Sequence, residues 1–111
     1  QARIETGATF KDNLAQLPPV AGLARIDLLG ADGTVVGNIE NLPGKQGSLA
    51  VYQYLKLCFG TLDAEAARHG LAAFAEHTAD ARENPGKHPN VDRLLEIAAG
   101  AEPLTIVAIA A

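Results

Sequence analysis

Residues 104–110 constrain the fold more than any other segment, because they read LTIVAIA and Thr105 is the only polar residue among them. A strand that is apolar on both faces needs cover on both, and such strands usually lie in the centre of a sheet. The sequence therefore predicts that a central strand forms near the C-terminus and that earlier strands flank it.

A hairpin is predicted to supply strands for this sheet. Polar and apolar residues alternate from Arg25 to Leu28, as expected for a strand with one buried face. Residues 31–33 read Ala-Asp-Gly and supply the turn, because glycine tolerates the positive φ that such loops need. The return strand is expected from Thr34 to about Glu40.

Four helices are predicted from caps, stop signals and apolar residues spaced three and four apart. Gly70 lies inside the longest one, where glycine costs up to about 1 kcal/mol relative to alanine, so a close contact with another helix is expected there. The predicted helices are 10–17, capped by Thr9; the helix capped by Ser48 and stopped by Gly60; 63–83; and the helix from its cap Asn90 to Gly100.

These elements predict an α+β fold with a three-stranded, mainly antiparallel sheet in the order β-β-α-α-α-β, a short N-terminal helix, and helices packed on one face. Residues 9–111 form the single domain, while residues 1–8 show no periodicity and are interpreted as a disordered arm or a remnant of cloning. A sheet this small leaves its second face partly bare, so a homodimer that covers this face is expected.

Composition narrows the class of partner. The chain has 111 residues, 20% of them charged, and its 9 basic and 13 acidic side chains leave a net charge of −4. A nucleic-acid-binding protein normally has a basic face, so no nucleic-acid partner is expected. No apolar run approaches the roughly 20 residues that span a bilayer, so no membrane association is expected either. The single cysteine, Cys58, excludes an intramolecular disulfide and favours a reducing, cytoplasmic location.

Glycine, proline and histidine mark the most distinctive segments of the chain. These segments resemble an uncharacterised family of small proteobacterial proteins, domain of unknown function 2322, over roughly residues 10–110. The resemblance implies a stand-alone bacterial protein, and it brings no activity, cofactor or catalytic residue. The segments that carry it are residues 10–14 (FKDNL), 39–52 (IENLPGKQGSLAVY), 74–78 (FAEHT) and 84–95 (NPGKHPNVDRLL).

The best candidate binding site is the segment Gly44, Lys45, Gln46, Gly47 and Ser48 at the start of a predicted helix. Unpaired amides at a helix start attract anions, the glycines allow close approach, and the lysine adds a charge. The segment does not match the phosphate-binding loop of nucleotide hydrolases, which needs Gly-Lys followed directly by Ser or Thr. The alternative interpretation is a polar turn in which Ser48 is an ordinary cap.

A second candidate segment, residues 84–90, contains two prolines and a glycine that fix its geometry, and it presents Lys87 and His88. If it meets Gly44–Ser48, the lysines and the histidine would make an anion pocket. Helical spacing also places potential metal ligands together, but such spacing is ordinary on a solvated helix, so no metal site and no cofactor are predicted. These residues are Glu65, His69, Glu76, His77 and Asp80.

No complete catalytic set is present, so the sequence favours a non-enzymatic binding or accessory protein. Such a protein would act through a protein partner or a small anionic ligand at Gly44–Ser48. The alternative is a phosphate- or nucleotide-handling enzyme that uses Lys45, Ser48 and His88, with Asp12 or Asp32 holding a metal.

Overall fold

The apolar strand β4 (Leu104–Ala110) lies inside an antiparallel sheet, between β1 (Leu23–Leu29) and β3 (Thr61–Leu62). The strand β2 (Val35–Glu40) pairs with the other side of β1, so the sheet order is β2-β1-β4-β3. The predictions of a hairpin and of a central last strand are both confirmed. This computed structural model describes residues 2–111.

The sheet has four strands in the described range, and not the predicted three. The additional strand, β3, is only two residues long and pairs Thr61 with Thr105 and Leu62 with Leu104. Two residues are too few to show the alternation that marks a strand in a sequence. The prediction of three strands in the order β-β-α-α-α-β was therefore wrong, while the α+β class is confirmed.

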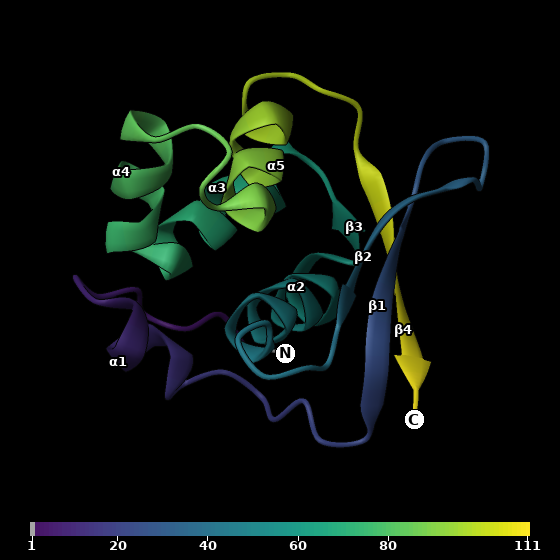
Figure 1. Cartoon of the computed structure of the whole chain (residues 1–111), viewed down its shortest axis with the longest axis horizontal. Helices are drawn as coiled ribbons and strands as arrows, with labels where there is room; N and C mark the ends of the chain where they lie inside the picture. The colour runs from purple at the N-terminus through teal and green to yellow at the C-terminus, as the bar shows by residue number, and fades with distance from the viewer. Residues whose placement is uncertain (1) are drawn as a thin grey trace.

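All helices of the described chain lie on one side of the sheet, as predicted (Figure 1). The core fills the space between them, and it joins Ile26, Leu28 and Ile106 of the sheet to buried residues of the helices. Within residues 2–111, none of the helices combines the length and hydropathy that spanning a bilayer would require. The helices are α1 (Phe10–Leu14), α2 (Gln46–Phe59), α3 (Ala64–Phe74), α4 (Glu76–Glu83) and α5 (Pro89–Ala98).

The single long helix predicted for residues 63–83 is broken at Ala75 into α3 and α4. Ala75 has φ of 51° and ψ of −117°, a backbone conformation that a side chain with a Cβ rarely adopts. Alanine is the strongest helix former, so its presence in the sequence pointed to an uninterrupted helix. Asp63 caps α3 by accepting a hydrogen bond from the amide of Ala66.

The predicted contact at Gly70 is confirmed. A Cβ at this position would lie 2.8 Å from a methyl carbon of Leu55 on α2 and 2.8 Å from one of Leu94 on α5. Gly70 therefore marks a point where α3 lies close to both neighbouring helices. A side chain at this position would collide with both leucines, which explains why a glycine occurs inside this helix.

The residues before α1 run along the helices without regular structure, and Ile4 packs against the core. The amide of Ile4 donates to the Tyr54 hydroxyl over 2.8 Å, and the guanidinium of Arg3 lies 4.4 Å from the centre of the Phe59 ring. Of the predicted arm at residues 1–8, Gln1 lies outside the described residues.

The outer face of the sheet carries no helix (Figure 1). It presents the ion pair between Arg25 and Asp27, with 2.8 Å between Nε and Oδ1, and beside it the partly exposed Leu29, Val107 and Ile109. This is the face on which a second copy is expected, and the homodimer stays a prediction.

Candidate functional site

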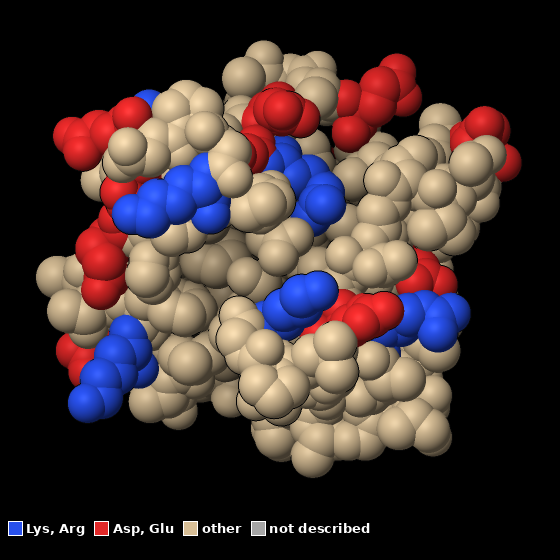
Figure 2. Space-filling model, viewed as in Figure 1, with Lys and Arg blue, Asp and Glu red and all other residues tan. Residues whose placement is uncertain are grey.

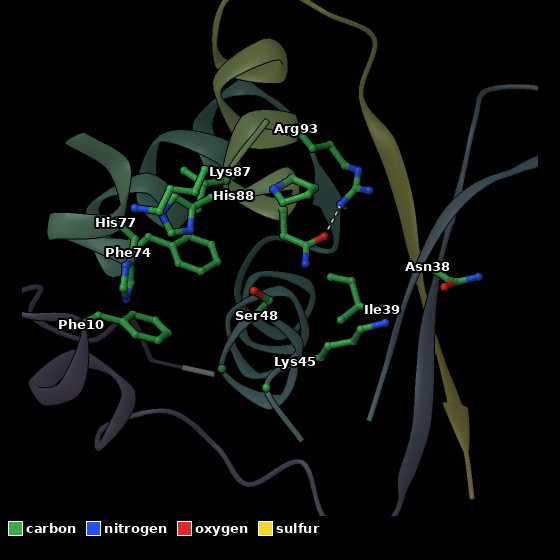
Figure 3. A pocket seen from close by; sticks show the side chains of 15 residues that line it. Phe10, Asn38, Ile39, Lys45, Ser48, Phe74, His77, Lys87, His88 and Arg93 are labelled. Atoms are coloured by element: carbon green, nitrogen blue, oxygen red, sulfur yellow. Dashed lines mark hydrogen bonds between the residues drawn. The ribbon is translucent and has the colours of Figure 1, made fainter. Parts of the chain in front are cut away.

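A pocket of about 540 Å³ opens where residues of α1, α2, α3, α4 and α5 meet the edge strand β2 (Figure 3). Its walls come from α1, β2, the starts of α2 and α5, the break between α3 and α4, and the loop that follows α4. The residues that line it are Phe10, Asn38, Ile39, Gly44, Lys45, Gly47, Ser48, Phe74, His77, Lys87, His88, Pro89, Asn90, Val91 and Arg93.

The two loops that the sequence singled out meet at this pocket. Gly44, Lys45, Gly47 and Ser48 line it from the start of α2, and Lys87 and His88 line it from the loop before α5. Gln46 does not line the pocket. Its side-chain amide donates instead to Oδ1 of Asn41 over 2.9 Å and ties the first turn of α2 to the preceding loop.

The helix α2 begins at Gln46, with Lys45 as the residue before it, so the expectation that Ser48 caps this helix was wrong. A turn sets the start instead, since the amide of Lys45 donates to the carbonyl of Leu42 and Gly44 has φ of +84°. Within residues 2–111, the amides of residues 46–48 donate to no acceptor. The hydroxyl of Ser48 makes no hydrogen bond in the same range. Gly47 and Ser48 therefore bring unsatisfied donors to the pocket wall.

The start of α5 is the second such helix end at the pocket. Pro89 is its first residue and His88 precedes it, so the predicted cap Asn90 lies one residue inside the helix. Pro89 has no amide hydrogen, and the amide of Asn90 has no acceptor in the described chain. The pocket therefore faces the partial positive charge of two helix starts.

A buried tyrosine in the middle of α2 links that helix to the start of α5 and orients Arg93. The hydroxyl of Tyr52, on α2, donates to the carbonyl of Asn90 over 2.6 Å and accepts from Nη1 of Arg93 over 3.2 Å. The same Nη1 donates to Oδ1 of Asn90 over 2.9 Å (Figure 3). Burial raises the pKa of Tyr52 to about 12, so the hydroxyl keeps its proton and remains a donor at neutral pH.

Asp80, on α4, holds both basic residues of the second loop. Its Oδ2 lies 2.7 Å from Nε2 of His88 and 2.9 Å from Nζ of Lys87, and its Oδ1 accepts from Nδ2 of Asn84 over 2.9 Å. The hydrogen bond from His88, followed by that from Lys87, holds the pKa of Asp80 well below its ordinary value. Asp80 therefore stays anionic and fixes how Lys87 and His88 are presented.

Aromatic rings form the opposite wall. Phe10 stacks on Phe74 with ring centres 5.4 Å apart and an angle of 18° between the planes, and His77 meets Phe10 edge-on at 5.1 Å. The ring of His88 continues the series, 5.4 Å from that of His77. The ring of Phe10 packs directly on the backbone of Gly47. It can do so because Gly47 has no side chain, since a Cβ there would lie 3.0 Å from the ring.

Charge distinguishes this pocket from the rest of the molecule. Three basic residues line it, Lys45, Lys87 and Arg93, and its described lining includes no Asp or Glu, although the whole chain carries a net charge of −4. Figure 2 shows basic side chains gathered around the hollow. Lys87 is paired with Asp80, whereas Lys45 and Arg93 form no ion pair with residues 2–111.

The two acidic residues expected to hold a metal in the alternative enzyme lie elsewhere. Asp12 and Asp32 do not line the pocket, and Asp32 accepts from the amide of Thr34 in the hairpin turn. In the part of the chain that the structure describes, no three His, Cys, Asp or Glu side chains are grouped so that they could hold a metal.

Sequence reasoning missed the side chains that complete the pocket. Phe10 and Phe74 were not considered as site residues, and His77 and Asp80 were assigned to a solvated helix. Arg93 was not considered as a site residue. Phe10, Phe74, His77 and Arg93 lie in the segments that carry the family resemblance, which is the one signal that could have found them.

Comparison with known proteins gives a family and no function. No curated protein matches the chain, and no solved structure does. Residues 10–108 match the model of a family described as an uncharacterized protein conserved in bacteria, domain of unknown function 2322, as the resemblance implied. This match covers nearly the whole chain, and the protein therefore belongs to that family.

Proposed function

We propose that this protein is a non-enzymatic binding protein and that its pocket takes up a small organic anion. The observation that carries the proposal is the lining of the pocket, in which three basic side chains and no acidic one occur in a chain with a net charge of −4. An excess of acidic residues elsewhere makes this local reversal of charge hard to attribute to composition alone.

Hydrogen-bond donors without partners add to this support. The amides of Gly47, Ser48 and Asn90 and the Ser48 hydroxyl have no partner in the described chain, and all four groups belong to residues of the pocket wall. A carboxylate or phosphate oxygen would accept from such groups, and hydrogen bonds to a charged group contribute about 1.5–3 kcal/mol each.

Three of the basic side chains are also held in place before a ligand arrives. Asp80 fixes Lys87 and His88, while Tyr52 and Asn90 fix Arg93. A site whose side chains are already ordered loses less conformational entropy on binding, so more of the interaction energy appears as affinity.

The test is thermal unfolding of the full chain with a panel of phosphates, nucleotides and organic acids, followed by calorimetric titration of those that shift the midpoint. A ligand at one hundred times its dissociation constant adds about 2.7 kcal/mol, which raises the midpoint of a domain of this size by roughly ten degrees. Affinity should fall as salt is added, because salt screens partly exposed charges.

A matched pair of variants assigns the binding to the pocket. Lys45→Ala should weaken binding about tenfold through the loss of one charged hydrogen bond. Lys56→Ala, on the same helix but outside the pocket, should change it by less than a factor of about two. Equal effects of the two substitutions would place binding elsewhere, and a panel without any shift would leave a protein partner as the ligand.

A second candidate function rests on the pair formed by Asp80 and His88. A carboxylate that holds one ring nitrogen of a histidine at 2.7 Å orients the ring for general acid or base chemistry at the other nitrogen. This arrangement supports a phosphate- or nucleotide-handling enzyme that uses Lys45, Ser48 and His88.

Turnover separates the two functions. An enzyme should release phosphate from phosphate esters or nucleotides, and both His88→Ala and Asp80→Asn should abolish the release. A binding protein should bind its anion in the same solutions without converting it.

A further inference from the structure

We infer that the anion bound by this pocket is carried on a flat aromatic ring. This inference rests on the proposed function and adds the class of ligand to it. It follows from three properties of the pocket, which are its size, its row of rings, and the separation of those rings from the unpaired positive charges.

The pocket is much larger than a bare inorganic anion. Its volume is about 540 Å³, whereas one water molecule takes up about 30 Å³ of liquid, and pockets for organic ligands measure about 300–1,000 Å³. An ion such as phosphate would fill only a small part of the space. The ligand therefore carries a body as well as a charged group.

The row of rings indicates the nature of that body. Phe10, Phe74 and His77 come from three different helices and lie in contact, with ring centres 5.1–5.4 Å apart. Phe10 is fixed from two sides, since its amide donates to Oε1 of Glu76 over 2.6 Å and its ring rests on Gly47. Phe74 is only 3% exposed and supports Phe10 from behind, so the surface open to a ligand is that of Phe10 and His77, which are half-buried. A rigid aromatic surface at the edge of a pocket favours a flat, apolar partner.

The positive charges that are free of ion pairs lie across the pocket from these rings. Figure 3 shows Lys45 and Arg93 on the side toward β2, while Phe10, Phe74 and His77 lie on the side toward α1 and α4. Ser48 lies between the two sides. A molecule with an anionic group at one end and a ring at the other would contact both walls together, whereas a short aliphatic anion would leave the exposed parts of the aromatic wall in water.

The experiment compares anions that differ only in the flatness of their body. Calorimetric titration of the full chain uses phenyl phosphate against cyclohexyl phosphate, and benzoate against cyclohexanecarboxylate, with methyl phosphate and acetate as references without a ring. Favourable aromatic contacts correspond to about 3- to 10-fold in affinity. In at least one pair the aromatic member should therefore bind at least threefold more tightly than its saturated partner, and more tightly still than the reference.

A substitution in the aromatic wall locates the preference. Phe10→Leu keeps an apolar side chain but removes the ring, so it should reduce the preference to less than twofold. Lys11→Ala, at the neighbouring exposed position of α1, is the matched control and should leave the preference unchanged.

The outcomes separate this inference from the proposed function. Equal binding of aromatic and saturated members in both pairs would overturn the aromatic ligand and leave the anion site standing. Binding that Lys45→Ala does not weaken, or no binding of any probe, would overturn the anion site as well. The comparison within each pair uses the unaltered protein, so it remains decisive even if Phe10→Leu fails to fold.

Discussion

Replacing Ala75 by glycine should stabilise this protein, although the same change in a helix normally destabilises one. Ala75 separates α3 from α4 and is the only non-glycine residue of the described chain with a positive φ, with φ of 51° and ψ of −117°. A residue with a Cβ held in such a conformation costs about 1–3 kcal/mol, and glycine adopts it without this strain.

Two effects oppose the gain. Glycine gives the unfolded chain more conformational freedom, which lowers the free energy of unfolding by about 0.4–1 kcal/mol. The half-buried methyl group of Ala75 is also lost. The expected net stabilisation is about 1 kcal/mol, which corresponds to a rise of about 4 °C in the midpoint of thermal unfolding for a domain near this size.

The assay is urea unfolding followed by circular dichroism, with thermal unfolding as a second measurement. The control is Ala79→Gly, at an exposed position inside α4, which should lower the free energy of unfolding by about 1 kcal/mol because its backbone is helical. Opposite signs for two identical substitutions four residues apart would establish the strain at Ala75. A loss of stability in both would refute it.

Three further predictions concern stability. Asn13→Ala should lower the free energy of unfolding by about 2–4 kcal/mol, because this buried amide hydrogen-bonds four backbone groups. Urea unfolding measures this change, and a loss below about 1 kcal/mol would contradict the role of Asn13. Gly70→Ala should cost about 1–3 kcal/mol by the same assay, because its Cβ would lie 2.8 Å from Leu55 and Leu94, and an unchanged midpoint would show that both leucines can move. Burial lowers the pKa of His69 below its ordinary value of 6.5, so the folded state favours the neutral ring and stability should fall as the pH drops through about 6.5. His69→Gln should make that fall smaller in a series of unfolding curves, and an identical pH dependence in the variant would exclude His69 as its source.

The parts of the fold that could be predicted from the sequence depend on local patterns. The apolar run of β4 indicates a strand buried on both faces, and the alternation in β1 indicates a strand buried on one face. Both strands were therefore recognised. The break at Ala75 has no such pattern, because alanine favours a helix and only contacts with distant residues hold it otherwise. The strand β3 was missed because its two residues pair only through tertiary structure.

The candidate site was predicted in part for a similar reason. The segments around Lys45 and His88 contain glycine, proline and charged residues, and these types stand out without any knowledge of the fold. Phe10, His77 and Arg93 look like ordinary residues of amphipathic helices, and they become site residues only when the helices and β2 converge. Every lining residue except Asn38 nevertheless falls within the segments that carry the family resemblance.

The end of α3 ties the strain at Ala75 to the pocket. Apart from tyrosines, Asn13 and Thr78 are the buried polar side chains of residues 2–111, and both hydrogen-bond carbonyls of the last turn of α3. Asn13 reaches the carbonyl of Ala73 at 3.0 Å, and Thr78 reaches that of Leu71 at 2.6 Å.

Burying a polar group costs free energy unless it is hydrogen-bonded, and carbonyls at a buried helix end need such partners. Asn13 and Thr78 therefore stabilise the end of α3 at Ala75, a residue type that would otherwise continue the helix. Asn13 also docks α1 against α3, which brings Phe10 onto Phe74, while the break turns the chain so that His77 reaches the same wall. An uninterrupted helix would remove the need for both buried polar groups and for the strain at Ala75. The break lies between Phe74 and His77, two rings of the aromatic wall, so the backbone strain at Ala75 occurs at the wall of the pocket.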